Sequence, residues 1–307
     1  MGIKKVESIW LDGALVPWDS ASDHLLAHTM HYGVGVFEGI RAYHRADGRT
    51  AVFRLREHID RLLDSCAICT MDSPFTRDQL MQACVDVVRA NKLAACYLRP
   101  LIYLGYGAMG LGSMESPVRT MVACYEWGAY LGDEGLKRGI RCMISSIARP
   151  SASSGMNKGK ICGQYVGSVL AKRMAAKSGF DEALMLDPQG YVAEGTGENI
   201  FVVKNGVVRT PPTSAAILAG ITRDTAITLL AEQGIEVRQE PIARDELYIA
   251  DEVFLTGTAA EITPVREIDH HKIGRGEAGA ITRGVQERFF SVVKGSDSKH
   301  DHWLTHV

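Results

Sequence analysis

The sequence predicts an α+β fold in two domains, and three observations lead to this prediction. The chain has 307 residues, more than a single core usually holds. Turn signals such as Asp12-Gly13 and Asp47-Gly48 separate short apolar runs, as is typical of β-hairpins. Few stretches show the strand–helix–strand order of a parallel sheet. We therefore expect a small N-terminal α/β domain, a larger strand-rich C-terminal domain, and a small-molecule site in the cleft between them.

Composition and charge exclude several classes of function. The 34 basic and 36 acidic residues give a net charge of −2, which lacks the positive excess that holds nucleic acid. No apolar run is long enough to span a bilayer, and the N-terminus turns polar too soon for a signal peptide. Seven scattered cysteines favour a reducing compartment. We therefore expect a cytoplasmic protein that binds neither nucleic acid nor membrane.

The small N-terminal domain is expected to span residues 1–128. The expected elements are hairpins at 8–18 and 39–55, helices at about 55–69 and 76–91, and strands at 95–105 and 119–127. Cys66 and Cys69 lie on the first helix, where packing is favoured over a redox or zinc role. The glycine-rich, polar stretch that follows is interpreted as an interdomain linker at 129–137.

The large C-terminal domain is expected to span residues 138–307. Its expected elements are a strand at 140–148, a helix at 163–178, three short strands in 181–210, a helix at 220–234, a strand pair at 251–265 and a helix near 279–293. The tail from 294 onward is polar, so it is expected to be loose, although Trp303 and Leu304 could dock.

The sequence lacks the common phosphate-loop and nucleophile-elbow motifs. His24, His28 and His31 have a spacing that would align them on a helix, but the chain becomes glycine-rich directly afterwards. Structural histidines are therefore favoured over metal ligands, and no metal site is expected.

Three other segments carry polar groups that could do chemistry, and their residues alone leave the choice open. Lys158 and Lys160 lie in a glycine-bearing loop, where either could be a reactive amine or a solvated side chain. Glu194 and Glu198 flank a Gly-Thr-Gly turn that could approach a ligand closely or face solvent. Thr222 lies at the start of a helix, where it could bind an anion or act as an ordinary cap.

Eight segments, in this order along nearly the whole chain, resemble the class IV aminotransferases, the pyridoxal-phosphate enzymes of fold type IV. They are HYGVGVFEGIRAY, FRLREHIDRLLDS, YLRPLIYLG, WGAYLG, KICGQY, VAEGTGENIFVV, LAGITRD and DEVFLTGTAAEITPV. Within this family the segments are most similar to the branched-chain amino acid aminotransferases. The resemblance implies that family's two-domain fold, its cofactor pyridoxal 5'-phosphate, and its site residues.

The resemblance assigns Lys160 as the catalytic residue, which forms the Schiff base with the cofactor and then moves the substrate proton. Glu194 is implied to face the pyridine nitrogen and keep it protonated. The remaining cofactor contacts implied are Tyr165 to the ring oxygen, and Arg61, Ile221, Thr222 and Thr258 to the phosphate. Lys158 has no counterpart in the family and is interpreted as a solvated loop residue. Gln164 stands where the family often has Asn, a local change.

The same resemblance implies the substrate contacts. Tyr97 and Arg99 are implied to hold the substrate carboxylates, and the backbone of Thr258, Ala259 and Ala260 is implied to add donors. The apolar wall is implied to consist of Tyr32, Phe37, Trp127 and Tyr130, with Gly39 leaving room. The expected reaction is a ping-pong transamination of leucine, isoleucine and valine with 2-oxoglutarate, since an apolar pocket separates such side chains weakly.

Two alternatives stay open at this point. The chain could be a D-amino acid or (R)-amine transaminase of the same fold, although the Tyr97-x-Arg99 pattern argues against this. It could also be a non-catalytic small-molecule binder, which intact Lys160, Glu194 and Arg61 disfavour. In either case the family implies a homodimer or higher homo-oligomer whose sites are shared between subunits.

Overall fold

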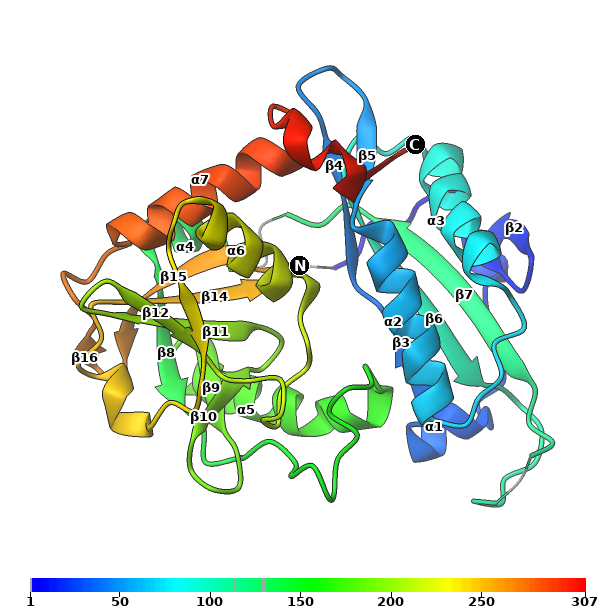
Figure 1. Ribbon diagram of the computed structural model, residues 1–307. Coiled ribbons are helices and arrows are strands. Elements are labelled where there is room, and N and C mark those ends of the chain that lie inside the picture. The colour runs from blue at the N-terminus through cyan, green and yellow to red at the C-terminus, as the bar shows by residue number, and fades with distance from the viewer. Residues whose placement is uncertain (1, 113, 129–130) are drawn as a thin grey trace. The chain divides into compact units, whose positions relative to one another are not determined.

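The computed structural model describes residues 2–112, 114–128 and 131–307 (Figure 1). The contacts within the chain divide it into two compact units. Unit 1 comprises Met1–Trp127, Gly159–Gln164 and Val292–Val307, and unit 2 comprises Gly128–Lys158 and Tyr165–Ser291. Each unit combines helices with a largely antiparallel sheet, so the predicted α+β class is confirmed.

Unit 1 is built on an antiparallel sheet that has eight strands among the described residues. The strands are β1 (Ser8–Leu11), β2 (Ala14–Pro17), β3 (Gly35–Phe37), β4 (Ile40–His44), β5 (Thr50–Phe53), β6 (Cys96–Leu104), β7 (Val118–Tyr125) and β17 (Leu304–His306). Their order is β17-β5-β4-β6-β7-β1-β2, and β3 also pairs with β6. The predicted Asp12-Gly13 and Asp47-Gly48 turns join β1 to β2 and β4 to β5, and both glycines have positive φ.

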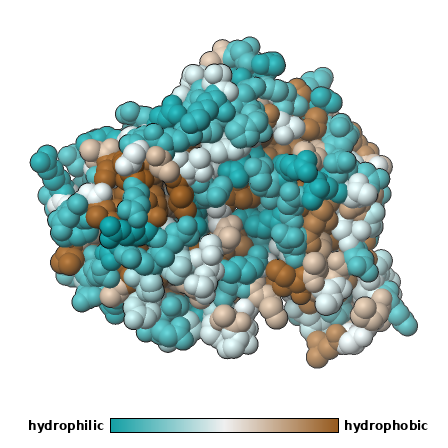
Figure 2. Space-filling model, in the orientation of Figure 1, coloured by the Kyte–Doolittle hydropathy of each residue, from teal (hydrophilic) through white to brown (hydrophobic). Residues whose placement is uncertain are grey.

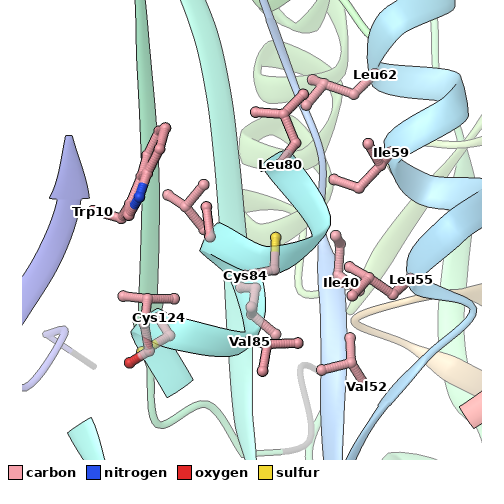
Figure 3. Packing of buried hydrophobic residues seen from close by; sticks show 14 of the residues in the cluster. Trp10, Ile40, Val52, Leu55, Ile59, Leu62, Leu80, Cys84, Val85 and Cys124 are labelled. Atoms are coloured by element: carbon pink, nitrogen blue, oxygen red, sulfur yellow. The ribbon is translucent and has the colours of Figure 1, made fainter. Parts of the chain in front are cut away.

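Two long helices cover this sheet, α2 (Leu55–Ile68) and α3 (Arg77–Asn91). The apolar residues of α2 recur three or four positions apart, which places them on one face. Thr76 begins α3 with a capping box to Gln79. Figure 3 shows how the two helices and the strands pack their buried side chains together, including Ile40, Leu62, Leu80 and Cys124. This core supports the strands that carry the predicted site residues of unit 1.

The C-terminal tail forms part of unit 1. A 3-10 helix, η4 (Ser298–Trp303), leads into β17, which pairs with β5. Trp303 is buried against the ring of Phe53, and its carbonyl accepts the backbone N–H of Arg54 at 2.7 Å. The expectation of a loose tail is therefore wrong, because apolar Trp303 and Leu304 have a sheet edge to cover.

Unit 2 contains a mixed sheet with nine strands among the described residues. The strands are β8 (Ile140–Ile144), β9 (Glu182–Leu186), β10 (Val192–Gly195), β11 (Asn199–Lys204), β12 (Val207–Thr210), β13 (Val237–Gln239), β14 (Glu252–Gly257), β15 (Glu261–Ile268) and β16 (His271–Lys272). Their order is β10-β9-β8-β15-β14-β11-β12-β13, and β16 also pairs with β15. The helices are α4 (Asp133–Arg138), α5 (Tyr165–Lys177), α6 (Ile221–Glu232) and α7 (Ala280–Val293), the last of which runs into unit 1.

Two parallel strand pairs in unit 2 are joined through helices, β8 to β9 through α5 and β12 to β13 through α6. The remaining neighbours are mostly hairpins, as the turn signals predict. The stretch 181–210 contains four strands rather than the predicted three, because the backbone N–H of Gly195 bonds to the Glu198 carbonyl at 2.7 Å and closes a turn there. Helix α4 occupies part of the predicted linker.

The division into units differs from the predicted domains, chiefly in two segments of the C-terminal half. The sequence places 159–164 and 292–307 in the C-terminal domain, whereas both segments pack in unit 1. The physical reason is backbone pairing, since Ile161 bridges Val36 and β17 pairs with β5. Within the described part of the chain, no helix is both long and apolar enough to cross a membrane. All seven cysteines lie in that part and are free thiols.

Candidate functional site

Lys160 is held in unit 1 by its backbone. Its N–H donates to the hydroxyl of Ser65 on α2, and its carbonyl accepts from the N–H of Phe37 on β3, both at 3.0 Å. Further along, the N–H of Gly163 donates to the carbonyl of Gly33. A Cβ on Gly33 would lie 2.7 Å from the Cα of Gly163, so the crossing requires glycine at this position. The chain around Lys160 is thus fixed on both sides.

Two predicted site residues, Lys160 and Arg99, come together at the ring of a third, Phe37. The Nζ atom of Lys160 lies 5.0 Å from the ring centroid, and the guanidinium carbon of Arg99 lies 4.8 Å from it. The same guanidinium lies 5.5 Å from the ring of Tyr97. Aromatic faces attract cations at these distances, so the two rings help to orient Arg99. One site of unit 1 therefore combines an amine, a guanidinium and apolar walls.

Tyr97 also depends on Gly39 and Trp127. A Cβ built on Gly39 would lie 1.8 Å from the Tyr97 hydroxyl, so the hydroxyl occupies the space that a side chain would need. The absence of a side chain at Gly39 thus admits Tyr97, and the contribution of Gly39 to a substrate pocket stays a prediction. The rings of Tyr97 and Trp127 pack edge to face with centroids 4.6 Å apart.

Tyr32 lies on a separate element, the short helix α1 (His28–Tyr32). Its side chain is exposed, its hydroxyl donates to the Met109 carbonyl at 3.1 Å, and its ring lies 4.7 Å from that of His28. It therefore joins the loop after β6 rather than the group around Phe37. Tyr130 lies outside the described residues.

Arg61 projects from α2 toward a carboxylate that the sequence does not single out. Its Nε and Nη2 groups donate to the two oxygens of Glu38 at 2.7 and 2.9 Å. Glu38 also receives the Nδ1 of His58 at 2.7 Å. Arg61, the proposed phosphate ligand, thus forms an ion pair with the buried carboxylate of Glu38.

In unit 2, Glu194 is a buried carboxylate with several donors. The Nε of Arg149 lies 3.0 Å from one oxygen. The side-chain amide of Asn199 and the backbone N–H of Leu218 each donate to the other oxygen at 3.1 Å. Charge-assisted bonds of this kind stabilise the ionised form and fix its direction. Such a carboxylate is suited to face a protonated ring nitrogen.

The N-terminus of α6 lies close to this carboxylate. The residue at its N-cap is Gly220, and no side chain caps the helix, so of the two alternatives for Thr222 the ordinary cap is excluded. A Cβ on Gly220 would lie 2.0 Å from Oδ1 of Asn199, which explains why glycine stands there. The backbone N–H groups of the first turn, including those of Ile221 and Thr222, lack intrahelical acceptors and favour an anion.

The turn between β14 and β15 carries Thr258, Ala259 and Ala260. Gly257 pairs with Glu261 across this turn, and Asn199 pairs with Thr256 on the neighbouring strand. These registers bring the turn beside Asn199 at the start of β11, whose side-chain amide donates to Glu194. Glu194, the start of α6 and this turn are therefore gathered at one part of unit 2.

Tyr165 and Lys158 belong to unit 2, although Lys160 belongs to unit 1. Tyr165 is the first residue of α5. The amine of Lys158 donates to the backbone carbonyls of Thr213 and Ile217, the latter at 3.1 Å. Lys158 is exposed, as predicted for a loop residue, and its amine also ties the loop to the segment before α6. Burial lowers the pKa of Lys158, and Glu194 opposes this shift.

Glu198, the second glutamate of the Gly-Thr-Gly turn, is also buried. Burial, together with the nearby carboxylate of Glu182, raises its pKa from 4.5 to about 8. The nearby ammonium group of Lys172 forms its ion pair with Glu182, and Glu182 also accepts a hydrogen bond from the hydroxyl of Thr196. Burial therefore favours the protonated form of Glu198.

Glu38, Arg149 and Asn199 are site residues that sequence reasoning missed. For Asn199 a signal was available, because a tight turn joining 195 to 198 places 194 opposite 199. For Arg149 and Glu38 the single sequence carries no such signal, since their partners are distant along the chain. Among the described residues, no group of three or more His, Cys, Asp or Glu side chains could hold a metal ion.

Comparison with known proteins adds to this geometry. A family model described as amino-transferase class IV matches residues 35–268. The chain is 48% identical to the branched-chain-amino-acid aminotransferase of Pseudomonas aeruginosa over 97% of both chains. Its fold matches the crystal structure of the Escherichia coli branched-chain amino acid aminotransferase with a TM-score of 0.95, at 44% identity over 98% of this chain and 99% of that one.

A second solved structure is also similar, and its description names the cofactor. It is the branched-chain amino acid aminotransferase from Thermobaculum terrenum in its PLP-form, the holo-form, with a TM-score of 0.91, 37% identity, and 98% of each chain covered.

The raised pKa of Glu198 predicts a pH-dependent stability. Between 4.5 and about 8 the folded protein keeps a proton that the unfolded chain releases, so this group stabilises the fold less and less as the pH rises toward 8. Glu198→Gln removes that loss. We expect the variant to gain stability relative to the wild type between pH 6 and pH 9, measured by urea unfolding. Glu236→Gln is the control, because it removes an exposed carboxylate, and its difference in unfolding free energy from the wild type should not change with pH. If the unfolding free energies of Glu198→Gln and the wild type depend on pH in the same way, the prediction is contradicted.

Proposed function

The chain belongs to the class IV aminotransferases, and we propose that it transfers amino groups between branched-chain L-amino acids and 2-oxoglutarate with pyridoxal 5'-phosphate. The observation that carries this proposal is the similarity over nearly the whole chain to proteins named branched-chain aminotransferases, at 44 to 48% identity. The products are the branched 2-oxo acids and L-glutamate, by a ping-pong mechanism.

The donors and acceptors of unit 2 fit this cofactor. Glu194 is ionised and fixed by Arg149, as a partner for a protonated pyridine nitrogen must be. The uncapped first turn of α6 offers N–H groups to a phosphate, and Thr222 and Thr258 add hydroxyls. Tyr165 would donate to the ring oxygen. Arg61 is the remaining phosphate ligand proposed, since a guanidinium suits phosphate.

When bound, the cofactor supplies an electron sink that stabilises negative charge at the substrate α-carbon. Lys160 holds the cofactor through its amine and then moves the proton of that carbon. Its backbone bonds to Ser65 and Phe37 fix the start of a long side chain, which reduces the number of positions its amine can take. In this proposal the carboxylate of Glu194 stays negatively charged beside the pyridine nitrogen, and this keeps the nitrogen protonated.

Substrate recognition is proposed to rest on Arg99 and its aromatic neighbours. The guanidinium lies against Phe37 and Tyr97, so it can meet a carboxylate while its flat faces remain covered. Phe37, Tyr97 and Trp127 offer apolar surface to a branched side chain, and Ala259 and Ala260 offer backbone donors. Tyr32 and Tyr130 are the remaining wall residues proposed.

We further propose a homodimer or higher oligomer whose sites take residues from two subunits. Large apolar side chains are exposed on α1, on the turn before it and on the loop after β6. We call this set the apolar edge, and it consists of Leu25, Leu26, Met30, Tyr32, Tyr106, Leu111 and Met114. Figure 2 shows apolar residues at the lower right of the molecule, over the region where α1 lies in Figure 1. Burial of such surface stabilises association, and it would bring Tyr32 to a neighbouring subunit. The seven free thiols support a cytoplasmic location.

Paired half-reaction kinetics test the substrate class. The holoenzyme is mixed separately with L-leucine, L-glutamate, D-alanine and an (R)-amine, and the absorbance change of the bound cofactor is followed by stopped flow. We expect L-leucine and L-glutamate to react at least about a hundredfold faster than the other two. An L-amino acid can present its carboxylate to Arg99 and its α-hydrogen to Lys160 together, whereas D-alanine has the opposite configuration and the amine lacks the carboxylate. Faster reaction of D-alanine or of the amine would favour a D-amino acid or (R)-amine transaminase.

Two lysine variants test the catalytic assignment. Lys160→Ala should lower turnover by about a thousandfold or more and remove the visible band of the bound cofactor, because no other amine takes its place. Lys158→Ala is the matched control from the same loop. It should keep the band and most of the turnover, because its amine binds backbone carbonyls. The reverse pattern would show that the assignment is out of register.

The apolar edge gives a third prediction. Leu111→Asp together with Met114→Asp should shift the protein toward monomer in sedimentation velocity, because two buried charges oppose association. Ile249→Asp, which changes an exposed apolar residue of unit 2, serves as the control and should leave the assembly intact. A wild-type protein that sediments as a monomer at micromolar concentration would contradict the proposed oligomer.

A further inference from the structure

Glu38 is the most deeply buried carboxylate of unit 1, with a side chain that is 0% exposed. It lies between β3 and β4, and its backbone N–H donates to the carbonyl of Pro100 at 2.9 Å. Its neighbours in sequence both belong to the group described above, since Phe37 packs against Lys160 and Gly39 admits the hydroxyl of Tyr97. A charge in this position requires strong partners.

The side chains that bind Glu38 both come from one face of α2. Arg61 donates through Nε to one oxygen at 2.7 Å and through Nη2 to the other at 2.9 Å. His58, one turn earlier, lies 2.7 Å from the second oxygen through Nδ1, and the Gly39 N–H donates to that oxygen at 3.2 Å. Both oxygens are therefore fully engaged by groups of unit 1.

These contacts decide the charge of each group. Burial alone would raise the pKa of Glu38, but Arg61 and His58 together hold it well below its usual range. Burial lowers the pKa of His58 in spite of Glu38, so the imidazole is neutral and its Nδ1–H donates to the carboxylate. The cluster is thus one carboxylate, one guanidinium and one neutral donor.

We propose that Glu38, held in turn by His58, is a positioning residue that fixes the direction in which Arg61 presents its guanidinium to the phosphate of the cofactor. The inference rests on the phosphate-binding role proposed above for Arg61. A guanidinium is planar, so two bonds to its Nε and Nη2 edge fix both the plane and the heading of the Nη1 edge. An arginine side chain that is already ordered loses less conformational entropy when it binds an anion.

A merely structural role for Glu38 would affect all ligands of the site equally, whereas positioning of Arg61 would affect only ligands that carry a phosphate. The test therefore measures the affinity of the cofactor-free protein for pyridoxal 5'-phosphate and for pyridoxal by absorbance titration. The quantity compared is the ratio of the two dissociation constants, pyridoxal over pyridoxal 5'-phosphate. The proteins are the wild type, Glu38→Gln, Arg61→Met and the double variant.

We expect Glu38→Gln to lower this ratio about tenfold and Arg61→Met to lower it further. The double variant should match Arg61→Met, because Glu38 acts through Arg61. Asp60→Asn is the matched control, since it removes a different carboxylate, one on α2 that is paired with an arginine, Arg77, at an exposed position. It should leave the ratio unchanged.

The outcomes separate the inference from the proposed function. If Arg61→Met leaves the ratio unchanged, the phosphate role of Arg61 is wrong and the inference is overturned with it. If Arg61→Met lowers the ratio but Glu38→Gln does not, the inference alone is overturned. If Glu38→Gln does not fold, Glu38→Asp keeps the charge but withdraws the carboxylate by one methylene. That variant should lower the ratio about threefold, and an unchanged ratio would overturn the inference.

Discussion

Backbone hydrogen bonding divides the loop of the two lysines between the two units, and the arrangement of the site depends on this division. Lys160 is bound to α2 and β3 in unit 1 through its N–H and carbonyl, whereas Lys158 is bound through its amine to carbonyls in unit 2. The crossing of Gly33 and Gly163 closes the segment on its far side. Two residues of separation therefore give the lysines different surroundings, and neither can take the place of the other.

The electrostatics of the site follow from what each buried glutamate receives. Glu38 has a guanidinium and an imidazole, and Glu194 has a guanidinium, an amide and a backbone N–H. Both are arranged to carry charge. Glu198 receives the backbone N–H of Gly197, while the nearby ammonium of Lys172 is bound to Glu182. The cations near the buried glutamates are thus distributed unequally, so the pKa of Glu38 is lowered by its partners whereas burial beside Glu182 raises the pKa of Glu198.

The sequence predicts more of the fold than of the way the site is supported. Hairpins at Asp12-Gly13 and Asp47-Gly48 are predicted correctly, because their turn residues act locally. The family itself is also predictable, since its motifs lie in order along the chain. The roles of Glu38 and Arg149 are not predictable, because each is paired with an oppositely charged residue far along the chain, Arg61 and Glu194 respectively. The contact between Gly39 and the hydroxyl of Tyr97 is not predictable either, because only the folded sheet brings the two residues together.

The composition of unit 1 has a consequence for how the protein is made. This unit requires the segment 159–164 and the last strand, β17, as well as the N-terminal part of the chain. Domains generally fold as they leave the ribosome, the N-terminal one first. Here the edge beside β5 lacks its partner until Leu304–His306 has been synthesised and released from the exit tunnel. The N-terminal unit is therefore the one that finishes last during translation.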